Sequence, residues 1–161
     1  MLYFAYGSNL DSAQMRQRCP SAQFVAIAKL PRHRLAFTRN SVGRKCGVAD
    51  AVPDDAATIW GAVFAIAETD IGGLDKSEGF RPGRPAADNS YNREERHVWR
   101  NGNENDPLLV SIYFANRQTN VSPPNTDYKR LIVDGARFWH LPADYLATLD
   151  QIEIGPAPDR S

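Results

Sequence analysis

The order of the predicted elements constrains the fold of this chain more than any other feature of its sequence. Segments typical of strands come first, at residues 2–6, 23–29, 34–39, 58–66, 91–99 and 108–115. Helical patterns end the chain: Thr126 caps a helix with one apolar side formed by Tyr128, Leu131, Ile132 and Phe138, and Pro142 begins another with Leu146, Leu149 and Ile152. The order predicts an α+β fold, because strands followed by helices differ from the alternating βα pattern of a parallel sheet.

Length and charge limit the possible classes further. A chain of 161 residues with 42% hydrophobic content fits one domain, predicted at 1–154, with a flexible C-terminal tail at 155–161. Lys plus Arg and Asp plus Glu are both 19, so we expect no nucleic-acid partner and no membrane partner. The chain begins without a basic region followed by a long apolar run, which predicts a cytoplasmic location.

The cysteines and histidines indicate neither a disulfide framework nor a metal site. Cys19 and Cys46 have no CxxC spacing, and we expect them to be reduced thiols. The three histidines, His33, His97 and His140, form no pair at the spacing of metal ligands. We therefore predict no metal.

A short stretch near the start, FAYGSN, joins the first predicted strand to a turn at Tyr6, Gly7, Ser8 and Asn9. Glycine after a strand allows backbone angles closed to other residues, and consecutive N–H groups beside a helix start form a concave site for an anion. Asp11 or Ser12 then caps a short helix that ends near Arg18. An ordinary tight turn is the alternative interpretation, since Gly, Ser and Asn are common turn residues.

The second stretch, ETDIGGLDKSEGF, predicts a short helix that ends at Gly79. Ile71, Leu74 and Glu78 stand at positions i, i+3 and i+7, which puts one carboxylate on the apolar face at the negative end of the helix. Both effects raise the pKa of a glutamate and suit it to acid–base catalysis near neutral pH. The alternative places Glu78 at the rim of the helix in solvent.

Five motifs together resemble the gamma-glutamylcyclotransferases. They are YGSN, LDKSEG, SIYFANR, PPNTDYKRLIVDGA and HLPADYLATLDQIE, and they cover nearly the whole chain in the order of that family. The loop FRPGRPAADNS, residues 80–90, is longer than the resemblance implies and is a candidate lid.

The resemblance implies a fold, a reaction and a set of residues. The fold is a small mixed β-barrel flanked by helices, and the reaction cyclises a gamma-glutamyl amide to 5-oxoproline with release of the amine or amino acid. No cofactor is implied, and the partner is the small-molecule gamma-glutamyl substrate. Glu78 is the implied general acid/base. The substrate-binding residues implied are Tyr6, Gly7, Ser8, Asn9, Tyr91 and Tyr113.

Two alternatives stay open beside this hypothesis. The chain could be a non-catalytic binding protein, or a relative that acts on a specialised acyl substrate through the same pocket. The physiological amine and the oligomeric state are not determined by these patterns.

Eight Lys or Arg lie between residues 12 and 49 without an intervening acidic residue, and we interpret them as a solvated face. We interpret three aromatic residues at helical positions, Tyr128, Trp139 and Tyr145, as core.

Overall fold

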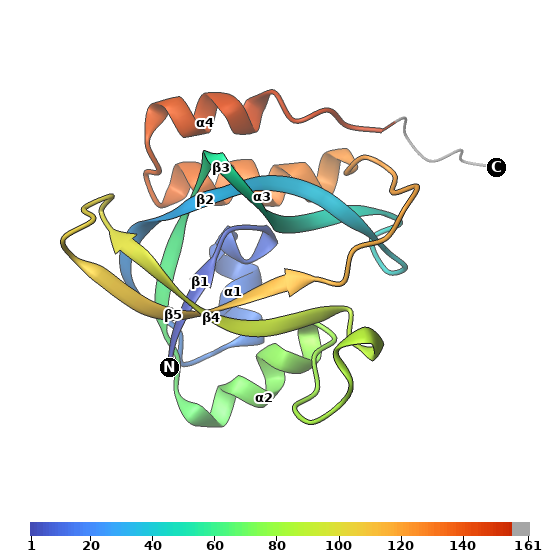
Figure 1. The fold of residues 1–161 in the computed structure, drawn as a ribbon, viewed down its shortest axis with the longest axis horizontal. Helices are drawn as coiled ribbons and strands as arrows, with labels where there is room; N and C mark the ends of the chain where they lie inside the picture. Colours follow the sequence, from blue (N-terminus) through green and yellow to red (C-terminus); the bar gives the residue numbers. More distant parts are fainter. Residues whose placement is uncertain (156–161) are drawn as a thin grey trace.

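A closed barrel of five strands forms the centre of the computed structural model, which describes residues 1–155 (Figure 1). The strands are β1 (Leu2–Ala5), β2 (Gln23–Ser41), β3 (Cys46–Ala65), β4 (Tyr91–Arg100) and β5 (Pro107–Ala115), in the spatial order β1-β3-β2-β4-β5. Neighbours are antiparallel except β1 and β5, which pair in parallel at Tyr3 and Ser111 and close the barrel. The predicted α+β class with a small mixed barrel is confirmed.

The helices of the described residues flank this barrel. They are α1 (Ser12–Arg18), α2 (Glu68–Ser77), α3 (Thr126–Phe138) and α4 (Ala143–Asp150), with short 3₁₀ helices at Ser8–Leu10 and Ala86–Asp88. In Figure 1, α3 and α4 lie together above the barrel and α2 lies below it. Within residues 1–155, no helix has the length and apolar character to cross a membrane. The predicted tail at 155–161 lies almost entirely outside the described residues.

The long β2–β3 hairpin differs from the prediction of short strands separated by loops. The two strands pair from Gln23 opposite Ala65 to Ser41 opposite Cys46, and β3 includes residues 46–57, which lie outside the predicted strands. Three register shifts interrupt the ladder, one of them beside Arg32, whose φ is 57°. At such shifts one strand has extra, unpaired residues, which bend it and interrupt the ladder locally. Within this segment, Val52 and Pro53 pair with Arg34 and His33 of β2, and residues 54–57 lie at the register shift, between the pairs His33–Pro53 and Pro31–Thr58.

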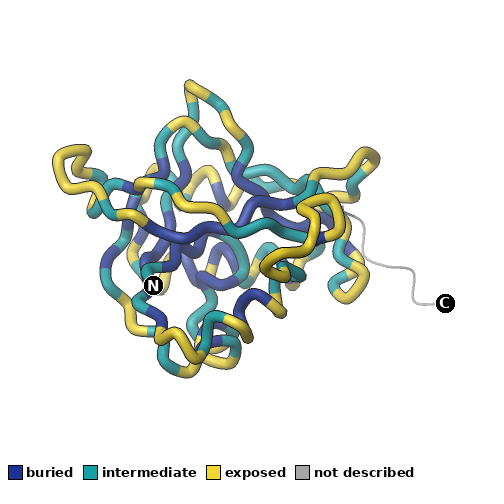
Figure 2. Tube along the Cα trace, turned by 60° about the horizontal axis from the view of Figure 1, so that its bottom comes forward, coloured by how far each residue is buried: buried dark blue, intermediate teal, exposed yellow. Residues whose placement is uncertain are grey.

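Helix α3 packs against the barrel and against the turn that follows β1. Tyr128 and Ile132 are buried as predicted, but Phe138, expected on the same apolar side, is 59% exposed. Phe138 is the last residue of α3 and projects away from the core, and its neighbour Trp139 instead donates from Nε1 to the carbonyl oxygen of Leu10 at 2.8 Å. The dark blue, buried segments of Figure 2 mostly follow the barrel strands.

Gly135 explains how closely α3 approaches the turn. A Cβ atom at this position would lie 2.4 Å from the carbonyl carbon of Leu10, closer than van der Waals contact allows. Only glycine fits between the helix and the backbone of residues 10 and 11. The turn that carries Gly7, Ser8 and Asn9 is thereby packed against α3.

Candidate active site

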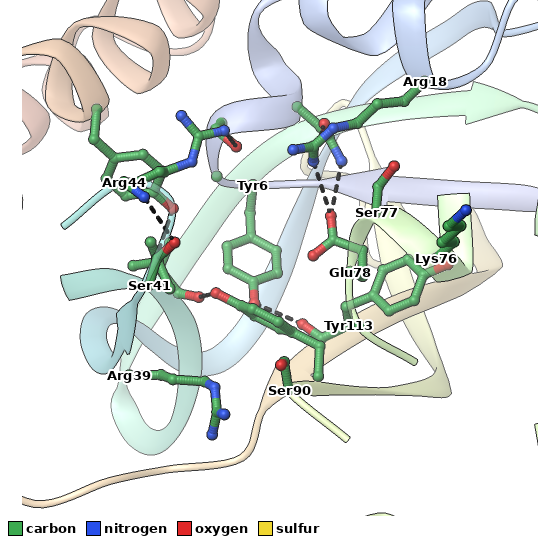
Figure 3. Close-up of a pocket in the computed structure, with 18 of the residues that line it drawn as sticks. Tyr6, Arg18, Arg39, Ser41, Arg44, Lys76, Ser77, Glu78, Ser90 and Tyr113 are labelled. Atoms are coloured by element: carbon green, nitrogen blue, oxygen red, sulfur yellow. Dashed lines mark hydrogen bonds and ion pairs between the residues drawn. The ribbon is translucent and has the colours of Figure 1, made fainter. Parts of the chain in front are cut away.

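A cavity of about 360 Å³ opens among the end of β1, the C-terminus of α2 and the tip of the β2–β3 hairpin. Figure 3 shows the side chains that surround it. All seven residues predicted to form the site line this one cavity: Tyr6, Gly7, Ser8, Asn9, Glu78, Tyr91 and Tyr113. Residues more than one hundred positions apart are therefore brought together, as the resemblance implied.

The turn after β1 forms the first 3₁₀ helix of the chain. The first hydrogen bond of this helix runs from Leu10 N to Gly7 O, at 3.1 Å. The N–H groups of Gly7, Ser8 and Asn9 come before this bond and therefore have no partner within the helix. The side chain of Asp11 then accepts from Gln14 N at 2.9 Å and caps α1, as expected. The turn offers backbone donors at the wall of the cavity.

Gly7 is required for a reason other than a positive φ. Its φ is −112°, so the expectation that the turn needs a left-handed backbone at this residue is wrong. A Cβ atom on Gly7 would instead lie 3.2 Å from Cβ of Ala49 and 3.7 Å from the hydroxyl of Tyr128. Glycine is favoured here because β3 and α3 approach the turn closely.

Glu78 is placed by the way in which α2 ends. Gly79 has a φ of 65°, and the N–H groups of Gly79 and Phe80 donate to the carbonyl groups of Lys76 and Asp75 at 3.1 and 2.9 Å. This arrangement is a Schellman motif, which satisfies the last carbonyl groups of a helix. A Cβ atom at residue 79 would lie 2.8 Å from Ser90, so glycine is needed for space as well as for its angles. Glu78 therefore follows the last helical residue and faces the cavity.

The surroundings of Glu78 agree with the predicted buried position and rule out the alternative at the rim. Its side chain is 14% exposed, and Leu74, one turn earlier, is fully buried. Burial raises the pKa of Glu78 above the ordinary value, although Arg18, Asn9 and Arg44 act in the opposite direction. A carboxyl group with a raised pKa can both accept and donate a proton near neutral pH.

The predicted tyrosines use their hydroxyl groups to bind the protein itself. Tyr6 donates to the carbonyl oxygen of Tyr113 at 2.6 Å, and Tyr91 donates to the carbonyl oxygen of Ala49 at 2.6 Å. Tyr113 donates to Asp75 Oδ1 at 2.6 Å. Burial raises the pKa of all three phenols, so they are neutral at physiological pH. They shape the wall of the cavity as rigid, uncharged side chains.

Comparisons with known proteins identify the family. The family model described as AIG2-like matches residues 58–149. A human protein named gamma-glutamylcyclotransferase is 31% identical over 157 residues, which cover 94% of this chain and 78% of the human protein. The chain belongs to the gamma-glutamylcyclotransferase family. The bovine protein of the same name is 32% identical with the same coverage.

A solved structure described as a gamma-glutamyl cyclotransferase supports the same conclusion. It superposes with a TM-score of 0.86 at 28% identity and covers 99% of this chain and 92% of the other. The resemblance inferred from the five motifs is therefore confirmed, and so is the fold that it implied. The match of the family model includes Glu78, Tyr91 and Tyr113 but begins after the YGSN turn.

Several residues at this cyclotransferase cavity were not predicted from the sequence. Tyr128, interpreted as core, accepts from Ala49 N at 2.9 Å and also lines the cavity. Arg44 stands over the Tyr128 ring at 5.0 Å and donates to Gln14 Oε1 at 2.8 Å. Tyr3, Arg18, Arg39 and Lys76 are among the other lining residues that were missed. The run of basic residues between 12 and 49 was the available signal, since three of its members, Arg18, Arg39 and Arg44, face the cavity rather than only solvent.

The long loop after Glu78 does not cover the cavity. Of residues 80–90, only Ser90 lines it. Arg84 holds the loop against the end of α2 by donating to Gly79 O at 3.0 Å and to Asn89 Oδ1 at 2.6 Å. The expectation of a lid is therefore wrong for this conformation. The tip of the β2–β3 hairpin, residues 39–44, borders the mouth of the cavity instead.

Proposed function

We propose that this chain cyclises a gamma-glutamyl amide to 5-oxoproline and releases the amine or amino acid, with Glu78 as the general acid/base. One observation carries the proposal: a buried carboxylate with a raised pKa lies in the same cavity as the N–H groups of the Gly7–Asn9 turn. A protein that only binds a ligand has no need for a buried carboxylate at this place. The names of the human and bovine relatives support the same activity.

The reaction needs a proton acceptor and a proton donor, and Glu78 can serve as both. Glu78 takes a proton from the substrate's α-ammonium group, and the free amine attacks the γ-carbonyl carbon. When the bond from this carbon to the leaving nitrogen breaks, Glu78 returns the proton to that nitrogen. The second proton of the attacking nitrogen follows the same path, so the amine leaves as an ammonium ion. General acid–base catalysis of this kind contributes about 10²- to 10⁴-fold in rate.

The turn and the tyrosines have complementary parts in the proposal. Backbone donors at Gly7, Ser8 and Asn9 suit a carboxylate of the substrate or the oxyanion that forms on the attacked carbonyl group. Tyr6, Tyr91 and Tyr113 limit the space in which the glutamyl chain folds back. Holding a reactive conformer of an intramolecular reaction can supply roughly 7 to 11 kcal/mol of the barrier reduction.

The charges at the cavity favour an anionic substrate. Arg18, Arg39, Arg44 and Lys76 line it, and Glu78 is the acidic residue among the lining residues described. A gamma-glutamyl amino acid carries two carboxylates and one ammonium group, whereas a gamma-glutamyl amine carries one carboxylate fewer. We therefore expect gamma-glutamyl amino acids to be turned over more efficiently than gamma-glutamyl amines.

The test is to incubate the purified protein with gamma-glutamyl amino acids, gamma-glutamyl amines and glutathione, and to measure 5-oxoproline by mass spectrometry. Glu78→Gln should lose about 10²- to 10⁴-fold in kcat. The matched control is Glu68→Gln, an exposed glutamate in the first turn of the same helix, which should retain normal turnover. If the folded wild-type protein binds a gamma-glutamyl ligand by calorimetry but releases no 5-oxoproline, the binding-protein alternative replaces this proposal.

A further inference from the structure

Arg18, at the end of α1, contacts both of the polar motifs that form the site. Its Nη1 atom donates to Asn9 Oδ1 at 3.1 Å and lies 3.4 Å from Glu78 Oε1. The Arg18 side chain is 23% exposed and that of Glu78 is 14% exposed, so the pair is partly shielded from solvent. Figure 3 shows the guanidinium group directly beside the carboxylate of Glu78.

The contact with Arg18 determines which way the Asn9 side-chain amide faces. Asn9 Oδ1 accepts from Arg18 Nη1 and from Gln14 Nε2 at 2.9 Å. Because a guanidinium group has only donors, the atom of Asn9 that faces it must be the oxygen. Asn9 Nδ2 is thereby directed to Glu78 Oε1 at 3.1 Å and to the Tyr3 hydroxyl at 2.9 Å.

Both donors reach the same oxygen of the carboxylate. Oε1 of Glu78 accepts from Asn9 and from Arg18, whereas Oε2 has no hydrogen-bond partner among residues 1–155. In Figure 3 the dashed lines converge on one oxygen of Glu78, and the other oxygen turns toward the side of the cavity where Tyr6 lies. The two oxygens of this carboxylate are therefore not equivalent.

We propose that Arg18 is a positioning residue that, together with Asn9, engages Glu78 Oε1 and leaves Oε2 as the atom that exchanges the proton with the substrate. This inference rests on the proposed function, because it assigns the proton of that reaction to one atom. The positive charge of Arg18 also lowers the pKa of Glu78 against the larger effect of burial, and so favours the ionised form that accepts the proton. Without Arg18, Oε1 would retain only the neutral donor from Asn9.

The other ionisable groups near Glu78 do not replace Arg18. Arg44 on the hairpin acts in the same direction on the pKa of Glu78, and Asp75 on α2 acts in the opposite direction, but neither has a direct contact with the carboxylate among the hydrogen bonds and ion pairs of the described residues. Lys76 on α2 also faces the cavity. The remaining groups are neutral phenols: Tyr3, Tyr6, Tyr91, Tyr113 and Tyr128.

The kinetic test compares Arg18→Met, Arg18→Lys and wild type in the pH dependence of kcat/KM for 5-oxoproline release. In Arg18→Met the acidic limb, which reports ionisation of Glu78, should move to higher pH. At pH values below the limb, kcat/KM of Arg18→Met should be about tenfold lower than that of wild type for each pH unit by which the limb has moved. Above it the rate should return toward that of wild type. Arg18→Lys, which keeps the charge, should restore most of the original position of the limb.

Arg39→Gln is the matched control, because Arg39 also lines the cavity but donates to Asn116 O at 3.0 Å and not to Glu78. This variant removes the same charge from the wall and should leave the acidic limb where it is in wild type. A purely structural role of Arg18 would lower the rate equally at all pH values. A role in substrate binding would raise KM without moving the limb. Either result would overturn the proposal.

A second measurement does not depend on activity. The ionisation of Glu78 can be followed by NMR of the ¹³C-labelled side-chain carboxyl groups. The Glu78 signal is identified as the one that is missing from the spectrum of Glu78→Gln. In Arg18→Met the Glu78 signal should titrate at higher pH than in wild type, and in Arg39→Gln it should not. An unchanged titration would contradict the inference even in an active protein. A shifted titration in a protein that releases no 5-oxoproline would refute the proposed function and leave the ion pair standing.

Discussion

The hydroxyl group of Tyr113 donates a hydrogen bond of 2.6 Å to Asp75 Oδ1 and so connects β5 to the last turn of α2. Asp75 is 4% exposed and forms an ion pair of 3.2 Å with Arg93. Its carbonyl oxygen accepts from Phe80 N, the bond that closes the end of the helix. Glu78 follows three residues later. Tyr113, in the wall of the cavity, therefore stabilises the end of α2, where the candidate base is placed.

Tyr113→Phe should lower the free energy of unfolding by about 1.5 to 3 kcal/mol, the range for a hydrogen bond to a charged group. The substitution removes one donor from a buried carboxylate and leaves it with Arg93. Urea denaturation of the two proteins measures the difference. An unchanged free energy of unfolding would mean that the Tyr113–Asp75 contact does not contribute to the stability of this region.

Glu78 should make the stability of the protein depend on pH in a defined direction. Burial raises its pKa in the folded state above the ordinary value of 4.5. An acid with a raised pKa in the folded state stabilises that state fully below the unfolded pKa, and this contribution is lost as pH rises through the folded pKa. The free energy of unfolding of wild type should therefore fall relative to that of Glu78→Gln as pH rises above 4.5, the ordinary pKa of glutamate. Thermal unfolding of both proteins over this pH range gives the comparison, and a difference in Tm that is constant with pH would contradict a raised pKa.

Gly7→Val should weaken substrate binding by crowding the wall between the turn and β3. The new side chain would start 3.2 Å from Ala49 Cβ and extend toward the hydroxyl of Tyr128. We expect KM to rise about tenfold, which corresponds to about 1.4 kcal/mol of binding free energy. Gly72→Ala is the control, since a Cβ atom there meets nothing within 4 Å. Normal binding of a glutamyl ligand by Gly7→Val would show that the turn does not hold the substrate.

Substrate preference should respond to the hairpin tip and not to the long loop. Val42 is 95% exposed and borders the cavity, whereas Ala87 lies in the loop away from it. Val42→Glu adds a negative charge at the mouth and should raise KM for substrates with an anionic leaving group by a few fold, from repulsion of about 1 kcal/mol. Ala87→Glu adds the same charge and should leave KM nearly unchanged. Equal effects of the two variants, measured with one panel of gamma-glutamyl substrates, would contradict this assignment.

The sequence by itself determined the features that depend on neighbouring residues. The cap at Asp11 and the end of α2 at Gly79 rest on contacts within a few positions. The apolar spacing of α2 left two positions open for Glu78, on the buried face of the helix or at its rim in solvent. The resemblance carried by the five motifs implied the barrel fold and seven of the residues that line the cavity.

Only the tertiary structure decided the features that depend on partners distant in the chain. Val52 and Pro53 belong to β3 because β2 pairs with them, and Tyr128 faces the cavity because Gly135 lets α3 approach the turn. Arg18 reaches Glu78 although sixty residues separate them. Local patterns report the conformation of the backbone and the buried face of an element, but the neighbours of a side chain across the barrel are set by the packing of the whole domain.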